Sequence, residues 1–141
     1  MSTLKTDGIS PPRSGKGRRI LIVDDDQTIL DFASQTLLKA GYVVQRTLDS
    51  RNVLFMEEIG SPLPELILLD VAMPNVDGLH LAFALRSNPR TFGIPIILMS
   101  GEMKAPPGYR LGELCGGKAY LDKPFTEADL LTSVALVLGL K

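Results

Sequence analysis

The chain alternates between short apolar runs and longer stretches in which apolar residues recur at helical spacing. Residues 19–23, 66–69 and 94–99 consist mostly of Ile, Leu and Val. A continuous apolar run of this length predicts a strand that is buried on both faces of a sheet. Residues 42–45 and 118–123 are less regular and predict two shorter strands.

Amphipathic helices are predicted between these strands. Asp26 can cap the first helix, whose apolar positions continue as far as a glycine stop at Gly41. Residues 50–59 predict a second helix. A third helix follows Gly78 and ends before Pro89, which disfavours a helical residue in front of it. The apolar positions that fit this third helix are Leu79, Ala82, Phe83 and Leu85.

The last third of the chain is less regular. Pro106, Pro107 and Gly108 interrupt residues 103–117, which predicts a long loop followed by a short helix over 109–115. Residues 126–129 have the pattern of a capping box and open the last helix, 130–139, which is apolar nearly all round. One face of this helix must pack on the sheet. The other face predicts either a protein contact, such as a homodimer through this helix, or packing against residues 109–115.

Five successive strand-helix units predict an α/β fold. Right-handed crossovers give a doubly wound, five-stranded parallel sheet with helices on both faces and an irregular fourth helix. A chain of 141 residues is long enough for one domain with a single sizeable core. The sequence contains no repeats and no glycine-rich phosphate loop.

The formal net charge of −1 is unevenly distributed. Residues 1–19 hold five basic side chains and one acidic side chain, a balance of +4, which leaves the rest of the chain at −5. Residues 1–18 are rich in Ser, Gly and Pro, so we expect a disordered basic leader ahead of a domain over residues 19–141. Arg18 and Arg19 could contact nucleic acid or an acidic partner, but so short a cluster without aromatic neighbours favours a solvated leader.

Composition narrows the chemistry that the chain can carry. The single cysteine, Cys115, excludes an internal disulfide and a zinc knuckle. The single histidine, His80, is expected on the outer face of its helix and leaves almost no material for imidazole metal sites or Ser-His-Asp triads. No apolar run is long enough to cross a bilayer, and the N-terminus lacks the apolar core of a signal peptide. We therefore expect a cytoplasmic protein without membrane contact.

Polar residues stand at the ends of four predicted strands, namely Asp24, Asp25, Asp70, Ser100 and Lys123. Asp26 has a capping role, whereas no structural role is expected for Asp24 and Asp25. Because three carboxylates in one crevice repel each other, a hard divalent cation with oxygen ligands is expected between them, and Mg²⁺ fits best. Asp70 beside the Lys123 ammonium could attack a phosphoryl group and form an aspartyl phosphate. Mg²⁺, Lys123 and the Ser100 hydroxyl would then neutralise the phosphoryl oxygens.

Four segments resemble the signature motifs of the receiver domains of two-component response regulators. They are residues 21–26 (LIVDDD), 68–78 (LLDVAMPNVDG), 96–101 (IILMSG) and 120–125 (YLDKPF). The segments stand in the family's order and spacing, and the resemblance runs from about residue 19 to residue 139. It implies a CheY-like (flavodoxin-like) fold and a domain that is not an enzyme, with at most self-catalysed phosphotransfer and autodephosphorylation.

The resemblance also implies a role for individual residues. Asp70 is the implied phosphoacceptor, and its donor is the phosphohistidine of a sensor histidine kinase or a histidine phosphotransfer protein. The implied Mg²⁺ ligands are Asp24, Asp25, Asp70 and the backbone carbonyl of Ala72. The implied phosphoryl-binding and switch residues are Ser100, Lys123 and Tyr120, and the implied cis peptide is Lys123-Pro124.

The chain departs from the family pattern in two places. Pro106, Pro107 and Gly108 occupy the start of the fourth helix, so the signalling face beside it is expected to have its own geometry and partner. Position 72 is Ala, where some relatives carry a polar or acidic side chain that influences hydrolysis of the phosphorylated state.

Three other functions fit parts of the pattern. A haloacid-dehalogenase-type phosphatase with an Asp nucleophile needs a second acid two residues later, where this chain has Ala72. A flavodoxin-like cofactor carrier needs a phosphate-binding loop after the first strand, where three aspartates stand. A receiver-like docking module without phosphorylation is disfavoured because no acceptor or support residue is missing.

Because two residues follow Gly139, we expect a single-domain receiver without an attached output domain. It would act on an unidentified downstream protein and is not expected to bind nucleic acid directly. Its output would come from docking, from dimerisation or from passing the phosphoryl group onward.

Overall fold

The computed structural model describes residues 17–49, 62–71, 78–100 and 120–140. In chain order the elements are β1 (Arg19–Val23), α1 (Gln27–Lys39), β2 (Val43–Thr47), β3 (Leu66–Asp70), α3 (Gly78–Ser87), β4 (Ile96–Ser100), β5 (Tyr120–Asp122) and α5 (Glu127–Leu138). All five strands are parallel and lie in the order β2-β1-β3-β4-β5. The predicted doubly wound parallel sheet is therefore confirmed.

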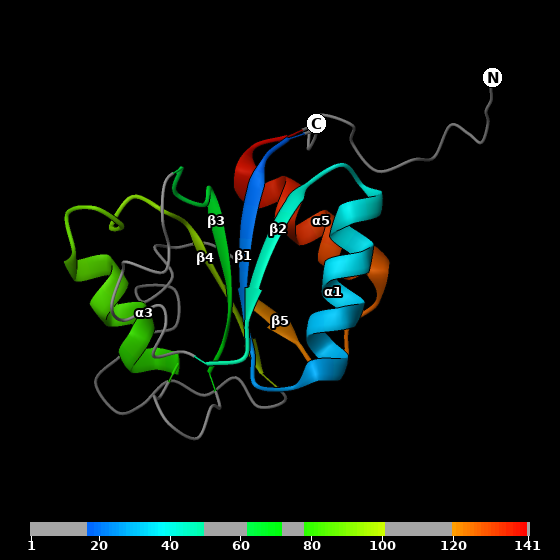
Figure 1. Ribbon diagram of the computed structural model, residues 1–141, viewed down its shortest axis with the longest axis horizontal. Helices are drawn as coiled ribbons and strands as arrows, with labels where there is room; N and C mark the ends of the chain where they lie inside the picture. Colours follow the sequence, from blue (N-terminus) through cyan, green and yellow to red (C-terminus); the bar gives the residue numbers. More distant parts are fainter. Residues whose placement is uncertain (1–16, 50–61, 72–77, 101–119, 141) are drawn as a thin grey trace.

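Helices cover both faces of the sheet (Figure 1). α1 and α5 lie on one face, and α3 lies on the other. Alternate residues of the central strands divide between two cores, as the period of two along a strand requires. Ile22 and Leu68 belong to the core beneath α1 and α5. Val23 and Leu69 belong to the core beneath α3.

The N-terminus of α1 is held as the sequence predicts. The Asp26 side chain accepts a hydrogen bond of 2.9 Å from the backbone N–H of Thr28, which satisfies one of the free donors in the first turn. At the other end, Gly41 has a φ of 96°, a conformation that glycine adopts without strain. The predicted cap and the predicted stop are both confirmed.

β2 extends further than its apolar residues suggested. The prediction placed a strand at 42–45, whereas the strand runs over Val43–Thr47, in register with all of β1. It lies at an edge of the sheet, and its side chains are exposed or half-buried, so polar residues are tolerated in it. Arg46 extends from this strand to Asp31 of α1, with 2.7 Å between Nη1 and Oδ1. The ion pair fastens the edge strand to the helix beside it.

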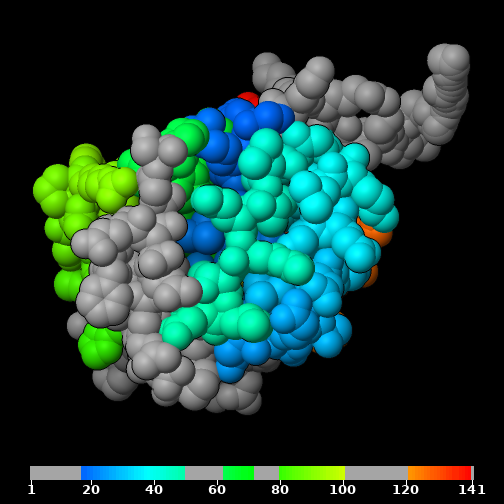
Figure 2. All heavy atoms as spheres, viewed as in Figure 1, coloured from blue at the N-terminus to red at the C-terminus, as the bar shows by residue number. Residues whose placement is uncertain are grey.

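The inward face of α3 differs from the prediction. Leu81, Ala82 and Leu85 are buried, whereas Phe83, which the sequence pattern placed on the inner face, is 51% exposed. His80 is exposed, as predicted. In the space-filling view, the end of α3 and the turn after it form one flank of the molecule (Figure 2).

β4 runs over Ile96–Ser100, so it begins two residues later and ends one residue later than the predicted strand over 94–99. β5 ends at Asp122, one residue earlier than predicted, and the first two residues of the predicted strand over 118–123 lie outside the described residues. The predicted helix over 50–59, the loop and short helix within 103–117, and Cys115 lie outside the described residues.

Arg18 and Arg19 contact Glu65 next to the start of β3. The Nε atom of Arg18 is 2.6 Å from a Glu65 carboxylate oxygen, and Nη2 of Arg19 is 3.6 Å from the other oxygen. Partial burial works to raise the pKa of Glu65, but the hydrogen bonds and charges of the two arginines outweigh it and lower this pKa. These two arginines therefore have a structural partner within the chain.

α5 begins with the predicted capping box. The Thr126 side chain accepts a hydrogen bond from the backbone N–H of Asp129, and the Asp129 side chain accepts one from the backbone N–H of Thr126. Both contacts satisfy donors that the first helical turn would otherwise leave free. The capping box therefore fixes where α5 starts.

We expect the replacement Thr126→Ala to lower the free energy of unfolding by about 1 kcal/mol, because it removes the acceptor for the Asp129 N–H. Urea unfolding monitored by circular dichroism measures the change. Thr132→Ala is the matched control, since Thr132 is exposed in the middle of the same helix and alanine is a good helix former. Equal losses in the two variants would contradict a capping role.

Candidate functional site

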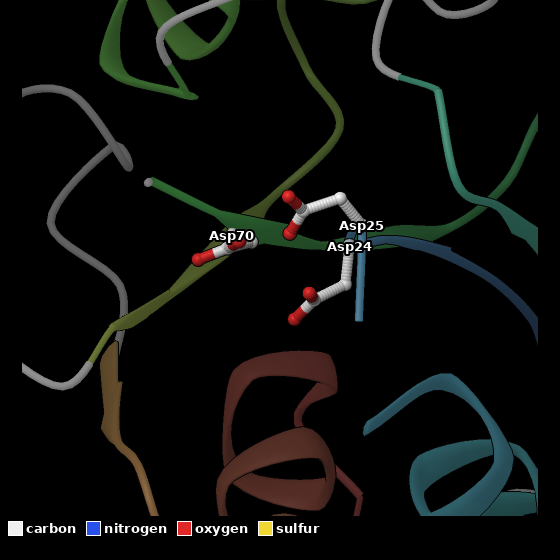
Figure 3. Close-up of side chains that lie close together, drawn as sticks. All are labelled: Asp24, Asp25 and Asp70. Atoms are coloured by element: carbon white, nitrogen blue, oxygen red, sulfur yellow. The ribbon is translucent and has the colours of Figure 1, made fainter. Parts of the chain in front are cut away.

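The ends of two neighbouring strands bring the predicted carboxylates together (Figure 3). Asp24 and Asp25 follow β1, and Asp70 is the last residue of the neighbouring strand β3. One carboxylate oxygen from each of the three residues lies within 4.8 Å of the other two. Ser100 ends β4, the next strand along the sheet. Because the strands are parallel, all these residues lie at the end of the sheet where the strands have their carboxyl termini.

The three carboxylates differ in their exposure to solvent. Asp24 and Asp70 are buried, whereas Asp25 is exposed. Oδ1 of Asp24 accepts a hydrogen bond of 2.9 Å from the backbone N–H of Asp26. Asp24 therefore helps to form the turn between β1 and α1, and the prediction that it has no structural role is wrong. The turn could not be foreseen because it depends on the backbone path after the strand.

Lys123 is the cation of this site. Its Nζ donates a hydrogen bond of 2.8 Å to Oδ2 of Asp24 and lies 3.4 Å from Oδ1 of Asp70. Partial burial works to lower the pKa of Lys123, but the hydrogen bond and charge of Asp24, with a smaller effect of Asp70, raise this pKa above its usual value. The ammonium group therefore stays charged and offsets part of the buried negative charge.

The position of Lys123 is fixed through its backbone. Its N–H donates a hydrogen bond of 2.9 Å to the carbonyl oxygen of Ser100, which joins the end of β5 to the end of β4. The Lys123–Pro124 peptide bond is cis. Phe125 packs into the core next to Phe32 of α1, with ring centroids 6.0 Å apart. The backbone hydrogen bond to Ser100 and the packing of Phe125 in the core thus fix the chain at Lys123.

The donor atoms of the site fit a hard divalent cation. All three side chains offer carboxylate oxygens, and among the residues that the structure describes neither a histidine nor a cysteine joins the cluster. Oxygen ligands of this kind suit Mg²⁺ or Ca²⁺ and not a structural zinc ion. Two of the carboxylates are buried, so a cation would relieve repulsion that solvent does not screen.

The structure describes one predicted site residue, Tyr120, only in part, and it does not describe another, Ala72. Tyr120 is the first residue of β5, and only its backbone is described. Ala72 lies outside the described residues. The roles that the family resemblance implies for them remain predictions.

The comparison with protein families agrees with this geometry. A family model described as response regulator receiver domain matches residues 20–135. The chain belongs to the response-regulator receiver-domain family. Receiver domains are typically not enzymes, and they partner with histidine kinases. The acidic site formed by Asp24, Asp25 and Asp70 is typical of a receiver metal site and is consistent with phosphoacceptor signalling.

Individual relatives and solved structures show the same relationship. The receiver is 34% identical over 125 residues to the transcriptional regulatory protein GltR of Pseudomonas aeruginosa, covering 89% of this chain and 50% of that protein. It is 28% identical to the protein PilG of the same species, covering 84% of this chain and 85% of PilG. It spans about half the length of the first curated relatives that it matches.

The chemotaxis response regulator CheY4 of Vibrio cholerae has a similar structure, with a TM-score of 0.74 and 30% identity. This match covers 86% of the present chain and 99% of CheY4. The fold of the receiver is therefore CheY-like. In the described part of the chain, every helix is too short or too polar to span a membrane.

Proposed function

We propose that this receiver accepts a phosphoryl group on Asp70 from the phosphohistidine of a histidine kinase or a histidine phosphotransfer protein. The observation that carries the proposal is the environment of Asp70. Its carboxylate is buried, lies 3.4 Å from the Lys123 ammonium and shares a cluster with Asp24 and Asp25. A carboxylate with this support is a suitable nucleophile for phosphoryl transfer.

The side chains of the receiver have distinct roles in this transfer. One carboxylate oxygen of Asp70 forms a bond to phosphorus while the bond between phosphorus and the donor imidazole nitrogen breaks, and the imidazole leaves. Lys123 and the Ser100 hydroxyl donate hydrogen bonds to the phosphoryl oxygens. Asp24, Asp25, Asp70 and the carbonyl of Ala72 would hold Mg²⁺. When bound, Mg²⁺ supplies positive charge that neutralises the phosphoryl oxygens.

Phosphorylation would then change a protein-interaction surface. Ser100 is the last residue of β4, and Tyr120 is the first residue of the neighbouring strand β5. The register partner of Tyr120 in β4 is Leu98, two residues before Ser100. We propose that Ser100 moves toward the phosphoryl group and that the Tyr120 ring turns inward as it does so. A surface that contains α5 would report this change to a downstream protein.

Two further assignments are part of the proposal. Residues 19–141 form the receiver and residues 1–18 a basic leader, as their composition indicates. A homodimer through α5 is one form that the output could take, because Leu136 of this helix is 73% exposed.

Incubation with acetyl phosphate and Mg²⁺ tests the proposed function, since acetyl phosphate is a small phosphoryl donor that needs no partner protein. We expect intact-mass spectrometry to show the addition of one phosphoryl group per chain, and EDTA to prevent it. A chain that gains no phosphoryl group under these conditions would not be a phosphoacceptor.

We expect Asp25→Asn to weaken Mg²⁺ binding by about tenfold, because it removes one of three negative charges from the cation site. Isothermal titration calorimetry measures the affinity. Asp25 is exposed, so the replacement should leave the fold intact. Asp26→Asn is the matched control, since asparagine is as good an N-cap as aspartate and Asp26 is outside the carboxylate cluster. Equal effects of the two replacements would remove Asp25 from the cation site.

A further inference from the structure

A groove of about 330 Å³ lies between α1 and the edge strand β2. Both elements are on the face of the molecule that Figure 2 shows. Four lining residues come from α1 at positions i, i+3, i+4 and i+7, which form one stripe along a helix. Two come from β2 and are two positions apart, so they lie on one face of the strand. The lining residues are Asp31, Ser34, Gln35, Leu38, Val44 and Arg46.

The groove has an apolar end and a charged end. α1 runs back from the carboxyl ends of the strands, so Leu38, near the end of the helix, lies across from Val44, near the start of β2. Asp31 lies two helical turns earlier and forms the ion pair with Arg46. Leu38 is 55% exposed. Each wall of the groove thus carries one apolar and one charged side chain, and the two charges are opposite.

The ion pair between Asp31 and Arg46 leaves part of its hydrogen-bonding capacity unused. Both hydrogen bonds of the Arg46 side chain come from Nη1 and go to Asp31 and Ser34. Oδ1 of Asp31 accepts the bonds from Gln27 and Arg46. Within the described part of the chain, Nε and Nη2 of Arg46 and Oδ2 of Asp31 therefore have no hydrogen-bond partner. The two side chains are 44% and 51% exposed, so a second molecule can reach these atoms.

The groove matches a second copy of itself. A twofold axis parallel to the groove exchanges its two walls, so α1 of each copy faces β2 of the other. Arg46 of one copy then faces Asp31 of the second copy, and Leu38 faces Val44 of the second copy, in both directions. A twofold dimer requires this kind of match, because the same patch serves both copies. The four charges alternate in sign, so no like charges are opposed.

We propose that the groove between α1 and β2 is a docking surface for a second copy of this chain, which forms a weak symmetric dimer. The dimer would be held by side chains and would not pair the two β2 strands. The groove contains one positive and one negative side chain, although residues 20–141 together carry −5. Asp31 would repel a strongly acidic segment, and Arg46 would repel a strongly basic one. Nucleic acid is a poorer occupant, because one arginine beside an aspartate neutralises few phosphates.

The proposed dimer goes beyond phosphoryl transfer and does not depend on it. β2 is at the edge of the sheet, and β1 separates it from β3, which ends at Asp70. The lining residues of the groove are distinct from the carboxylate cluster. The dimer can therefore be measured in EDTA without a phosphoryl donor. Uptake of phosphate from acetyl phosphate remains a separate measurement of the proposed function.

Sedimentation equilibrium of the full chain in EDTA, from about 10 µM to about 1 mM, tests the proposal. We expect a reversible dimer. Asp31→Arg would oppose arginines at both symmetric contacts, and Arg46→Asp would oppose aspartates there. Each replacement should weaken the dimer by at least about tenfold. Leu38→Ser should weaken it by about tenfold, because it removes the apolar contact with Val44 of the second copy.

An equimolar mixture of Asp31→Arg and Arg46→Asp separates contacts between copies from contacts within one chain. In a dimer of the two variants, each groove faces a groove of opposite charge. We expect the affinity to return to within about threefold of that of the unaltered chain. Mixing cannot restore the ion pair inside either chain, so this recovery reports on the contact between copies. Circular dichroism checks the fold of each variant, and Leu38→Ser, which keeps the ion pair, serves if a charge reversal unfolds the chain.

Matched variants on other surfaces serve as controls. Leu136→Ser removes a more exposed apolar side chain from α5. Asp122→Arg reverses an exposed charge at the end of β5, outside the groove. Both should leave the affinity of the dimer unchanged.

Several results would overturn the proposal. These are a chain that stays monomeric at every concentration, charge reversals that leave the dimer unchanged, or a mixture that associates no better than either variant alone. A dimer that is lost in Leu136→Ser would assign the contact to α5 instead of the groove.

Discussion

The replacement Asp70→Asn is expected to abolish phosphoryl uptake from acetyl phosphate. Asparagine has nearly the same shape as aspartate, but its amide lacks the negatively charged oxygen that would bond to phosphorus. Asp70 is buried between neighbouring strands, so a replacement of the same shape should keep the sheet intact. Intact-mass spectrometry in Mg²⁺ should show no adduct on the variant while the unaltered chain is modified.

Asp122→Asn provides the matched control for this experiment. Asp122 is the last residue of β5 and the register partner of Ser100, so it lies at the same carboxyl-terminal end of the sheet as Asp70. It is exposed and does not belong to the carboxylate cluster. This variant should be modified as readily as the unaltered chain. An adduct that persists in Asp70→Asn would move the acceptor to another residue.

The replacement Lys123→Ala is expected to lower the free energy of unfolding by about 3 kcal/mol in EDTA, because it leaves buried carboxylates without their cation. The lysine side chain is 21% exposed, so we place the loss at the lower end of what breaking a buried ion pair costs. Urea unfolding followed by circular dichroism measures the loss.

Lys39→Ala is the control for this second prediction. Nζ of Lys39 is 3.6 Å from a carboxylate oxygen of Glu127, but its side chain is 72% exposed, so its loss should cost at most about 1 kcal/mol. Mg²⁺ should then restore more stability to Lys123→Ala than to the unaltered chain, because the carboxylates of the variant have lost their internal cation. Equal costs for the two lysines would show that the charge of Lys123 is solvated and not part of the site.

The sheet could be predicted because its central strands are continuous apolar runs. Those in β1, β3 and β4 are long enough to be recognised, and the parallel order follows from the helical segments between them. The location of the site could be predicted by the same reasoning, since the carboxyl ends of parallel strands lie together at one end of the sheet. Asp24, Asp70 and Lys123, far apart in the sequence, meet there as expected.

Other features depend on tertiary structure that a pattern does not contain. The apolar residues of α3 fit two overlapping helical stripes, and only packing on the sheet shows that Leu81 is inside and Phe83 outside. Likewise, the polar residues Arg46 and Thr47 continue β2 because an edge strand needs no continuous apolar run. The turn formed by Asp24 depends on the backbone conformation after β1.

The ion pair between Arg46 and Asp31 has a consequence for solubility. An outer strand can recruit a strand from another molecule and start aggregation, and Val43 and Val44 would favour such growth. A guanidinium group held on this strand by a helix carboxylate makes the approach of a foreign strand costly, since its charge would have to be desolvated. We therefore expect the contact that fastens β2 to hinder the pairing of a strand from another molecule with this edge strand.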